Sequence, residues 1–409
     1  MTRMLNFGAL GVFALMLAAC GGGGGGGGDT GGGGGGLPPA PQNVVPIVVD
    51  EGPGPVANVN IPYVSVTICT PGSTTACQTI DHVILDTAST GLRILAAALD
   101  ASTNLPAQTD ATGASLAECM AFVDGYAWGA VRTADVRLAG QTARAIPIQI
   151  IADPAYPAIP ASCSATGPVA ISSAQSFVAN GVLGVGPFAE DCGPTCAQAA
   201  VPGTYYVCAS QVCSAVAVGP DRQVRNPVAA FPTDNNGIVV DLPAVPAIGA
   251  ATVSGNLILG IGTQSNNALG NATVFSLDAS GVLTTVFKGR TLGAFFDTGS
   301  NALFFPDGMP VCTVSSAAPG FYCPALAQDL NALVQGASGG ASGIVNFSVA
   351  NAAMLMTNRP TFVAFGNLAG PAPWAPVFDW GLPFFYGRRV FQAIEQRSTP
   401  GGAGPFIAF

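Results

Sequence analysis

Two short stretches of the sequence place an aspartate at the end of an apolar run and follow it with small residues. The first run ends at Asp86 within VILDTASTGLRIL, and the second ends at Asp297 within AFFDTGSNALFF. Each apolar run predicts a buried strand, and the small residues predict a tight turn that holds a carboxylate at the strand end. Two carboxyl groups that meet can share one proton and activate a water molecule for hydrolysis.

The two stretches superpose without a gap. The matched pairs are Asp86 with Asp297, Thr87 with Thr298, Ala88 with Gly299, Ser89 with Ser300, and Leu92 with Leu303. One aspartate after an apolar run is ordinarily a turn or capping residue. Two matched copies in one chain instead indicate a repeated structural unit.

Each half also carries a later apolar segment marked by glycine. These segments are NGVLGVGPF at residues 180–188 and DWGLPFF at residues 379–385. Gly184 follows Asp86 by 98 residues, and Gly381 follows Asp297 by 84. The sequence therefore predicts two halves of similar plan.

The composition favours an all-β protein. The chain has 409 residues, of which 49% are hydrophobic and 9% charged, with 54 glycines and 33 prolines. Such a chain can bury a large core and favours many short strands joined by turns. The net charge of −9 and the absence of a basic run exclude nucleic acid as an expected partner.

Together these motifs resemble the pepsin-type aspartic proteases, over residues from about 60 to 409. The stretch SGNLILGIGTQSNNALGNATVF at residues 254–275 is also similar to the opening of that family's second lobe. The resemblance implies a bilobal β-fold in which each lobe supplies one aspartate to a shared cleft. We expect the first lobe at residues 43–230 and the second at residues 231–409. The layout further resembles that of bacterial lipoproteins with two Asp-Thr-small-Ser motifs.

The resemblance assigns a role to each residue of the two turns. Asp86 and Asp297 would form the catalytic dyad. Thr87 and Thr298 would lock the two turns together. The supporting residues would also include Ser89, Gly299 and Ser300, the two serines by hydrogen-bonding the carboxylates. Ala88 departs from the family's usual glycine, and its methyl group is expected to strain the turn or to hold the carboxylates apart.

The family's flap is a hairpin that covers the substrate and carries a tyrosine. In this chain the stretch at residues 119–140 occupies the corresponding place, so Tyr126 is the predicted flap residue and Trp128 a packed aromatic residue.

The N-terminus resembles a bacterial lipoprotein signal. A short apolar stretch ends in LAAC, which implies a signal peptide at residues 1–19 and a lipid on Cys20. The Gly-rich residues that follow, within 20–42, predict a flexible tether. Gly21 favours the outer membrane by the same resemblance. The alternative is an ordinary secretory signal.

The remaining ten cysteines predict disulfide bonds, because an even number in an exported chain is typical of a disulfide framework. Close spacing suggests the pairs 69/77, 192/196, 208/213 and 312/323, which would leave 119/163, although the spacing alone does not fix the connectivity. The alternative is a zinc site formed by Cys192, Cys196, Cys208 and Cys213.

Other catalytic schemes are weaker. GASGG at residues 336–340 matches a serine hydrolase pattern, but His82 is the only histidine and precedes it, whereas that hydrolase order places histidine last. We expect a packed or capped His82.

Two hypotheses follow. The first is a membrane-tethered aspartic endopeptidase that prefers extended apolar peptides, with NALFFP and PFF lining its cleft. The second is a catalytically inactive lipoprotein that binds a polypeptide or envelope partner in the same cleft. Both predict a monomer without cofactor or metal, exported and lipid-anchored to the bacterial cell envelope.

Overall fold

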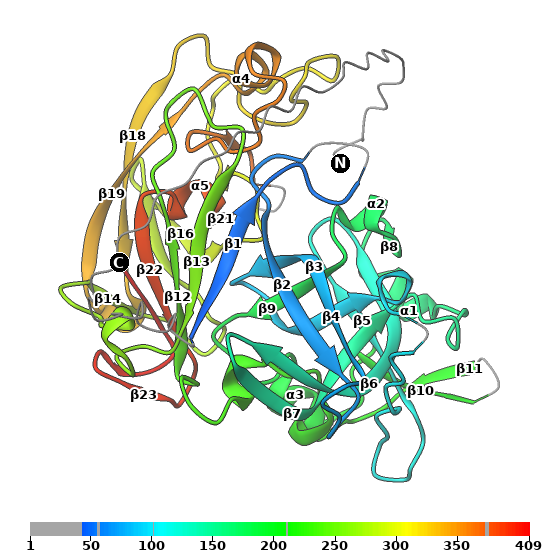
Figure 1. Ribbon diagram of the computed structural model, residues 1–409. Helices are drawn as coiled ribbons and strands as arrows, with labels where there is room; N and C mark the ends of the chain where they lie inside the picture. The colour runs from blue at the N-terminus through cyan, green and yellow to red at the C-terminus, as the bar shows by residue number, and fades with distance from the viewer. Residues whose placement is uncertain (1–42, 55–57, 101, 210–211, 373–375) are drawn as a thin grey trace, which may run out of the picture.

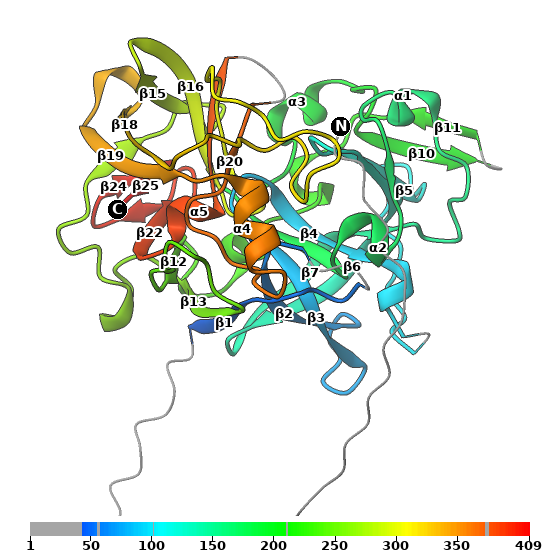
Figure 2. The ribbon, with the colours of Figure 1, turned by 90° about the horizontal axis from the view of Figure 1, so that it is seen from above.

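The computed structural model describes residues 43–54, 58–100, 102–209, 212–372 and 376–409. These residues form two lobes, drawn at the right and the left of Figure 1, and strands are the main element of both. The predicted all-β, two-lobed class is confirmed. In Figure 2 the strands β10 and β11 lie at the outer side of one lobe, and β18 and β19 at the outer side of the other.

Among the described residues, the larger sheet has 16 strands. They are β1 (Val44–Val49), β2 (Pro62–Cys69), β3 (Cys77–Asp86), β4 (Thr90–Leu95), β5 (Leu116–Ala121), β6 (Tyr126–Leu138), β7 (Gln141–Ile151), β8 (Ala170–Ile171), β9 (Gly181–Val185), β10 (Tyr205–Ala209), β11 (Val212–Ala215), β12 (Gly237–Leu242), β13 (Val253–Leu259), β14 (Val274–Ser276), β22 (Arg388–Ala393) and β25 (Phe406–Ala408).

The second sheet has seven strands in the described part of the chain, and a separate pair forms a third. The seven are β15 (Leu283–Phe287), β16 (Arg290–Asp297), β17 (Leu303–Phe304), β18 (Gln328–Gln335), β19 (Ser342–Val349), β20 (Ala369–Gly370) and β21 (Val377–Gly381), and the pair is β23 (Ser398–Thr399) with β24 (Gly402–Ala403). The α-helices are α1 (Ala161–Ser164), α2 (Ala174–Phe177), α3 (Gly193–Gln198), α4 (Ala352–Asn358) and α5 (Leu382–Phe385).

The larger sheet continues from one lobe into the other through β1. This strand pairs with β2 on one side and with β13 on the other, in a register that runs from Val44 opposite Ile258 to Val49 opposite Val253. Figure 1 shows β1 beside β13 between the lobes. The sheet therefore joins strands from both predicted halves, and the boundary at residue 230 stays a prediction.

The two halves repeat one strand arrangement. In the first, β9 lies parallel to β3 and antiparallel to β4, with Asp86 opposite Gly184. In the second, β21 lies parallel to β16 and antiparallel to β17, with Asp297 opposite Gly381. The glycine-marked segments are thus the partners of the strands that end in aspartate.

Both glycines are required by close packing. A methyl group at Gly184 would lie 2.7 Å from the backbone nitrogen of Thr90, and one at Gly381 would lie 2.6 Å from the carbonyl oxygen of Ser300. Because these neighbours are backbone atoms, a larger residue would push the aspartate turn away from its strand.

Within the described residues, five disulfide bonds cross-link the fold. The pairs are Cys69–Cys77, Cys119–Cys163, Cys192–Cys196, Cys208–Cys213 and Cys312–Cys323. These are the pairs suggested by the spacing. The zinc alternative is wrong in this structure, because its four cysteines form two disulfides and a disulfide sulfur is not a thiolate ligand.

The predicted signal peptide, the lipidation residue Cys20 and the tether lie outside the described residues. Within the described residues, no helix is both long enough and apolar enough to cross a membrane.

Candidate active site

Each predicted catalytic aspartate is the last residue of a paired strand. Asp86 ends β3, which lies between β2 and β9, and Asp297 ends β16, which lies between β15 and β21. Asp86 is 8% exposed and Asp297 is partly exposed. Because strands on both sides fix each backbone, the fold determines where the two carboxyl groups lie.

Thr87 and Thr298 bind the two aspartate turns to each other. The Thr87 hydroxyl accepts from the Thr298 backbone N–H at 3.0 Å and donates to the carbonyl oxygen of Phe296 at 2.9 Å. The Thr298 hydroxyl accepts from the Thr87 N–H at 3.1 Å and donates to the carbonyl oxygen of Leu85 at 2.6 Å. These four buried hydrogen bonds hold the ends of β3 and β16 together. They form the lock that the resemblance implied.

The two carboxyl groups meet beside Gly299. A methyl group at Gly299 would lie 3.1 Å from Asp297 Oδ1 and 3.1 Å from Asp86 Cγ. The Asp86 carboxyl raises the pKa of Asp297, so the two groups interact at short range. Two carboxyl groups at such short range favour a state in which one of them is protonated.

The methyl group of Ala88 neither strains the turn nor holds the two carboxyl groups apart, as had been expected. The residue is exposed and its backbone lies outside the left-handed region. Its N–H donates to Asp86 Oδ1 at 2.8 Å, as the N–H of Gly299 donates to Asp297 Oδ1 at 2.7 Å. The first turn therefore closes around its aspartate with alanine in place of glycine.

The two serines behave differently, although the sequence predicts one role for both. The Ser300 hydroxyl donates to Asp297 Oδ2 at 2.7 Å. Ser89 contributes its backbone N–H to Asp86 Oδ1 at 3.0 Å, while its buried hydroxyl has no hydrogen-bond partner within the described residues. The prediction of a hydroxyl–carboxylate bond is confirmed for Ser300 and wrong for Ser89.

The surroundings favour the protonated form of Asp297. Burial, followed by the nearby Asp86 carboxyl, raises the pKa of Asp297 from its ordinary value to about 8. The hydrogen bonds from Ser300 and Gly299 oppose this rise, because they favour the charged carboxylate. The net effect favours the protonated form of Asp297.

A third acid, Asp379, lies behind Asp297 and was missed by the sequence analysis. It sits in β21, is 2% exposed, and faces Asp297 and Ser300. Burial, followed by Asp297, raises the pKa of Asp379 well above its ordinary range. One sequence signal marks this residue, since it is a charged residue inside the apolar segment VFDWGLPFF.

The flap prediction for Tyr126 finds no support in its packing. The predicted hairpin is present as β5 and β6, and Tyr126 is the first residue of β6. Its side chain is 9% exposed and packs with Trp128, Tyr206 and the Cys119–Cys163 disulfide. This packing favours a structural role for Tyr126, and Trp128 is a packed aromatic residue as expected.

The aromatic segments predicted to line a substrate cleft lie mostly in the core. Phe305, Phe384 and Phe385 are at most 2% exposed, whereas Phe304 is partly exposed. They fill the interior of the second lobe, where Phe305 stacks on Phe378. The expected preference for apolar peptides therefore loses its structural basis.

The residues of the serine hydrolase pattern do not assemble. His82 lies 3.3 Å from Asp50 and 3.4 Å from Asp81, and packs edge-on against Tyr63. It is a half-buried histidine held between two aspartates and a tyrosine ring, close to the packed residue expected. Ser338 lies in a separate loop of the second lobe.

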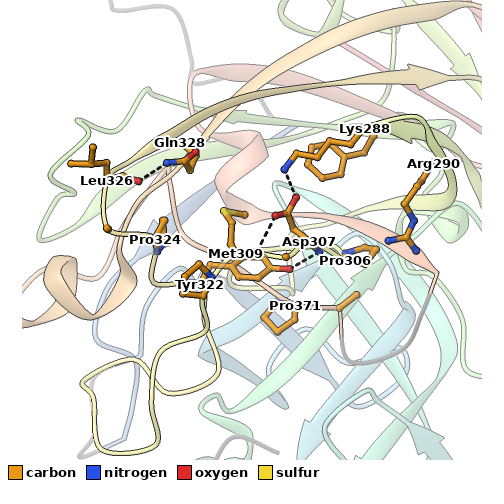
Figure 3. Close-up of a pocket in the computed structure, with 15 residues that line it drawn as sticks. Lys288, Arg290, Pro306, Asp307, Met309, Tyr322, Pro324, Leu326, Gln328 and Pro371 are labelled. Carbon is orange, nitrogen blue, oxygen red and sulfur yellow. Dashed lines mark hydrogen bonds and ion pairs between the residues drawn. The ribbon is translucent and has the colours of Figure 1, made fainter.

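A pocket of about 1050 Å³ lies away from the two aspartates. Its wall includes Arg290, Asp307 and Tyr322, and Lys288 donates to Asp307 at 2.6 Å across it (Figure 3). Arg290 begins β16 and Asp297 ends it, so their backbones are about 23 Å apart at the usual rise of a strand. This pocket is therefore separate from the dyad.

A solved structure with the same architecture supports the fold. The chain is similar to the aspartic proteinase from Irpex lacteus, with a TM-score of 0.51 and 14% sequence identity over 89% of this chain and 96% of that one. At this identity the likeness shows the pepsin-like fold and nothing about activity. No curated protein sequence matches the chain significantly.

Residues 39–409 match one family model, which covers both aspartate turns, both glycine-marked strands and all five disulfides. The chain is therefore a member of the family described as "Protein of unknown function (DUF3443)".

Proposed function

We propose that the protein is an aspartic endopeptidase in which Asp86 and Asp297 hydrolyse peptide bonds. The observation that carries the proposal is the reciprocal bonding of Thr87 and Thr298, which holds two strand-end carboxyl groups together beside Gly299. A pair of acids held together at a cost in electrostatic free energy is typical of a catalytic site.

The singly protonated pair provides a base and an acid. In this proposal ionised Asp86 takes a proton from a water molecule as the water attacks the scissile carbonyl carbon. Protonated Asp297 donates to the carbonyl oxygen, and the pair later returns a proton to the departing amine. The backbone N–H groups of Ala88 and Ser89 both donate to Asp86 Oδ1 and so fix the orientation of this carboxyl group.

The substrate class is polypeptide, with no side-chain preference assigned. We further propose that the protein is exported and attached to the bacterial envelope through a lipid on Cys20. The LAAC motif and the Gly-rich stretch before residue 43 support this attachment.

The proposal is tested by digesting a mixed peptide library with the purified protein and its variants. Asp86→Asn and Asp297→Asn should each abolish cleavage while the protein stays folded. Asp221→Asn is the matched control, since the side chain of Asp221 is 76% exposed and lies outside the dyad. A statine-type inhibitor should block the wild-type enzyme. Cleavage that persists in both dyad variants would rule out the mechanism, and peptide binding without cleavage by the wild type would favour the binding-protein alternative.

A further inference from the structure

The pocket of about 1050 Å³ in the second lobe plays no part in the proposed hydrolysis. Its volume is close to the upper end of the range of about 300–1,000 Å³ that is usual for ligand sites. Its wall combines apolar residues with a few charged side chains, as Figure 3 shows. This combination is typical of a binding site, because apolar walls exclude water and a few polar groups fix the orientation of the ligand.

Two segments joined by a disulfide form one part of the wall. Pro310 and Pro324 both line the pocket. The backbone N–H of Cys323 donates to the carbonyl oxygen of Pro310 at 2.7 Å, and the Cys312–Cys323 disulfide joins the same two segments. Tyr322 is fully buried, and its hydroxyl is bonded to the backbone of residues 305 and 307. The wall is therefore preformed, which lowers the entropic cost of binding.

Four of the residues that line the pocket are prolines, namely Pro306, Pro310, Pro324 and Pro371. Proline has no backbone N–H, so these positions offer a ligand no main-chain donor. A phosphate site built from successive backbone N–H groups is therefore not available there. Recognition of an anion in this pocket depends on side chains.

The cationic side chains come from the tip of the hairpin between β15 and β16. Phe287 lies opposite Arg290, so Lys288 and Gly289 form the two-residue turn. Lys288 has a φ of 48°, in the left-handed region where such turns favour asparagine, aspartate or glycine. It is also the only lysine of the chain. A lysine in a position that is unfavourable for its backbone favours a role for its side chain.

The described wall carries three charged side chains. Lys288 donates to Asp307 Oδ2 at 2.6 Å, and Asp307 Oδ1 accepts from the N–H of Met309 at 3.1 Å. Arg290 is exposed and has no hydrogen-bond or ion-pair partner for its side chain within the described residues. Two positive charges and one negative charge leave the wall with a net charge of +1, on a chain whose net charge is −9. A guanidinium group matches a carboxylate through two parallel hydrogen bonds.

We propose that this pocket binds an acidic segment of a polypeptide, with the carboxylate of a glutamate or aspartate on Arg290 and an adjacent apolar side chain against the prolines. Lys288, held by Asp307, adds a second positive charge to the same wall. The inference goes beyond the proposed hydrolysis and does not depend on it.

A polypeptide suits the pocket better than an anionic membrane does. Attachment to anionic lipid headgroups usually requires a cluster of about four to eight lysines or arginines, whereas this wall has two cations. Leu326 on the wall is 78% exposed and can pack against an apolar side chain. The Gln328 amide donates to the carbonyl oxygen of Leu326 at 2.8 Å, which leaves its own oxygen as an acceptor for a peptide N–H.

The test measures binding rather than cleavage. Two labelled peptides, one of alternating leucine and glutamate and one of alternating leucine and glutamine, are titrated with the Asp86→Asn protein and followed by fluorescence anisotropy. The glutamate peptide should bind about tenfold more tightly than the glutamine peptide, because only its carboxylates pair with the free guanidinium. Added salt should weaken the binding of the glutamate peptide.

Three further variants in the same background locate the binding. Arg290→Gln should weaken binding of the glutamate peptide about tenfold and leave the glutamine peptide unchanged. Arg144→Gln is the matched control, since Arg144 is also exposed and without an ion-pair partner in the described part of the chain, but lies in β7 of the first lobe. Asp307→Asn should tighten binding of the glutamate peptide about threefold, because it removes the one negative charge while asparagine can still accept from Met309. Circular dichroism checks that each variant is folded.

Equal affinity for the two peptides would overturn the proposal, and so would equal effects of Arg290→Gln and Arg144→Gln. A folded Asp307→Asn protein that binds the glutamate peptide no more tightly would overturn it as well. Attachment to phosphatidylglycerol vesicles that requires Arg290, without peptide binding, would replace the proposed polypeptide with a lipid headgroup. Because no readout uses cleavage, a wild type that cleaves no peptide refutes the proposed protease function alone, and a pocket that binds no acidic peptide refutes this inference alone.

Discussion

Thr87 and Thr298 lie 211 residues apart in the chain, yet each hydroxyl accepts from the other residue's backbone N–H. Each hydroxyl also donates to a carbonyl oxygen just before the opposite aspartate. This exchange makes the two halves one site, because neither aspartate turn is complete without the threonine of the other. Gln392 of β22 adds a further bond to the carbonyl oxygen of Thr87 at 2.8 Å.

Thr298→Val should destabilise the protein by about 2–4 kcal/mol, because it leaves a buried N–H and a buried carbonyl without partners. Urea unfolding checks this value. The double variant Thr87→Val/Thr298→Val should lose less unfolding free energy than the sum of the losses in the two single variants, because the two threonines share the same hydrogen bonds. Thr67→Val is the control, because Thr67 bonds Thr79 on an exposed surface. Equal losses of unfolding free energy in Thr298→Val and Thr67→Val would contradict a stabilising role for the buried hydrogen bonds between Thr87 and Thr298.

Gly299→Ala should reduce activity strongly, since its methyl group would lie 3.1 Å from the Asp86 carboxyl carbon. The carboxyl groups would have to separate, and a displacement of about 1 Å can cost roughly a hundredfold in rate. Ala88→Gly is the matched change in the other turn and should leave the rate nearly unaltered, because Ala88 is exposed. The measurement is the cleavage rate of each variant relative to wild type on the same peptide substrate. Similar losses in both variants would show that the turns are equivalent.

Peptide cleavage should decline in alkaline solution. Asp297 must be protonated to act as the acid, and its pKa is raised to about 8, so the protonated form persists through neutral pH and is lost above that value. The measurement is kcat/KM from mild acid to alkaline pH. In Asp86→Asn the neighbouring charge is gone, so carbon-13 NMR of the carboxyl group should show a lower pKa for Asp297. A rate that stays constant into strongly alkaline solution would contradict the assignment.

Stability should fall as the pH rises from the acid range. Asp191 lies in a buried cluster with Arg93, Glu118 and Tyr205, and burial followed by Glu118 raises the pKa of Asp191 well above its ordinary range. A raised pKa means that the folded state binds more protons. The stabilisation is therefore complete below the ordinary aspartate pKa and is lost as the pH rises through the folded-state value.

Urea unfolding at several pH values tests this dependence. Asp191→Asn should make the unfolding free energy depend less on pH, because asparagine keeps the shape of the neutral acid and cannot ionise. Asp221→Asn, on the surface, should leave the slope unchanged. A protein whose stability rises steadily toward alkaline pH would refute the prediction.

Local sequence was enough to predict the two strand ends and the two later glycine-marked segments, whereas the pairing of these segments with the aspartate strands came from the structure. Asp86 and Asp297 each close an apolar run, and Gly184 and Gly381 each interrupt a later one, because a strand that packs against a tight turn has no room for a side chain. Close spacing also suggested four of the five disulfide pairs, whereas Cys119–Cys163 was only the pair left over, and the connectivity was fixed by the structure.

What the side chains of the two turns do was decided by tertiary contacts. Ser89 and Ser300 have equivalent places in the repeat, yet only Ser300 bonds its aspartate. Tyr126 and the aromatic segments looked like substrate-facing residues and turned out to be packed inside.

The sequence by itself determined that two carboxylates would stand at the ends of two similar strands, because periodicity and turn residues act over a few neighbours. Only the tertiary structure decided that these carboxyl groups lie together beside Gly299, that the surroundings raise the pKa of Asp297, and that Asp379 is buried near it. Those properties depend on burial and on charges brought close from distant parts of the chain, and no local pattern records them.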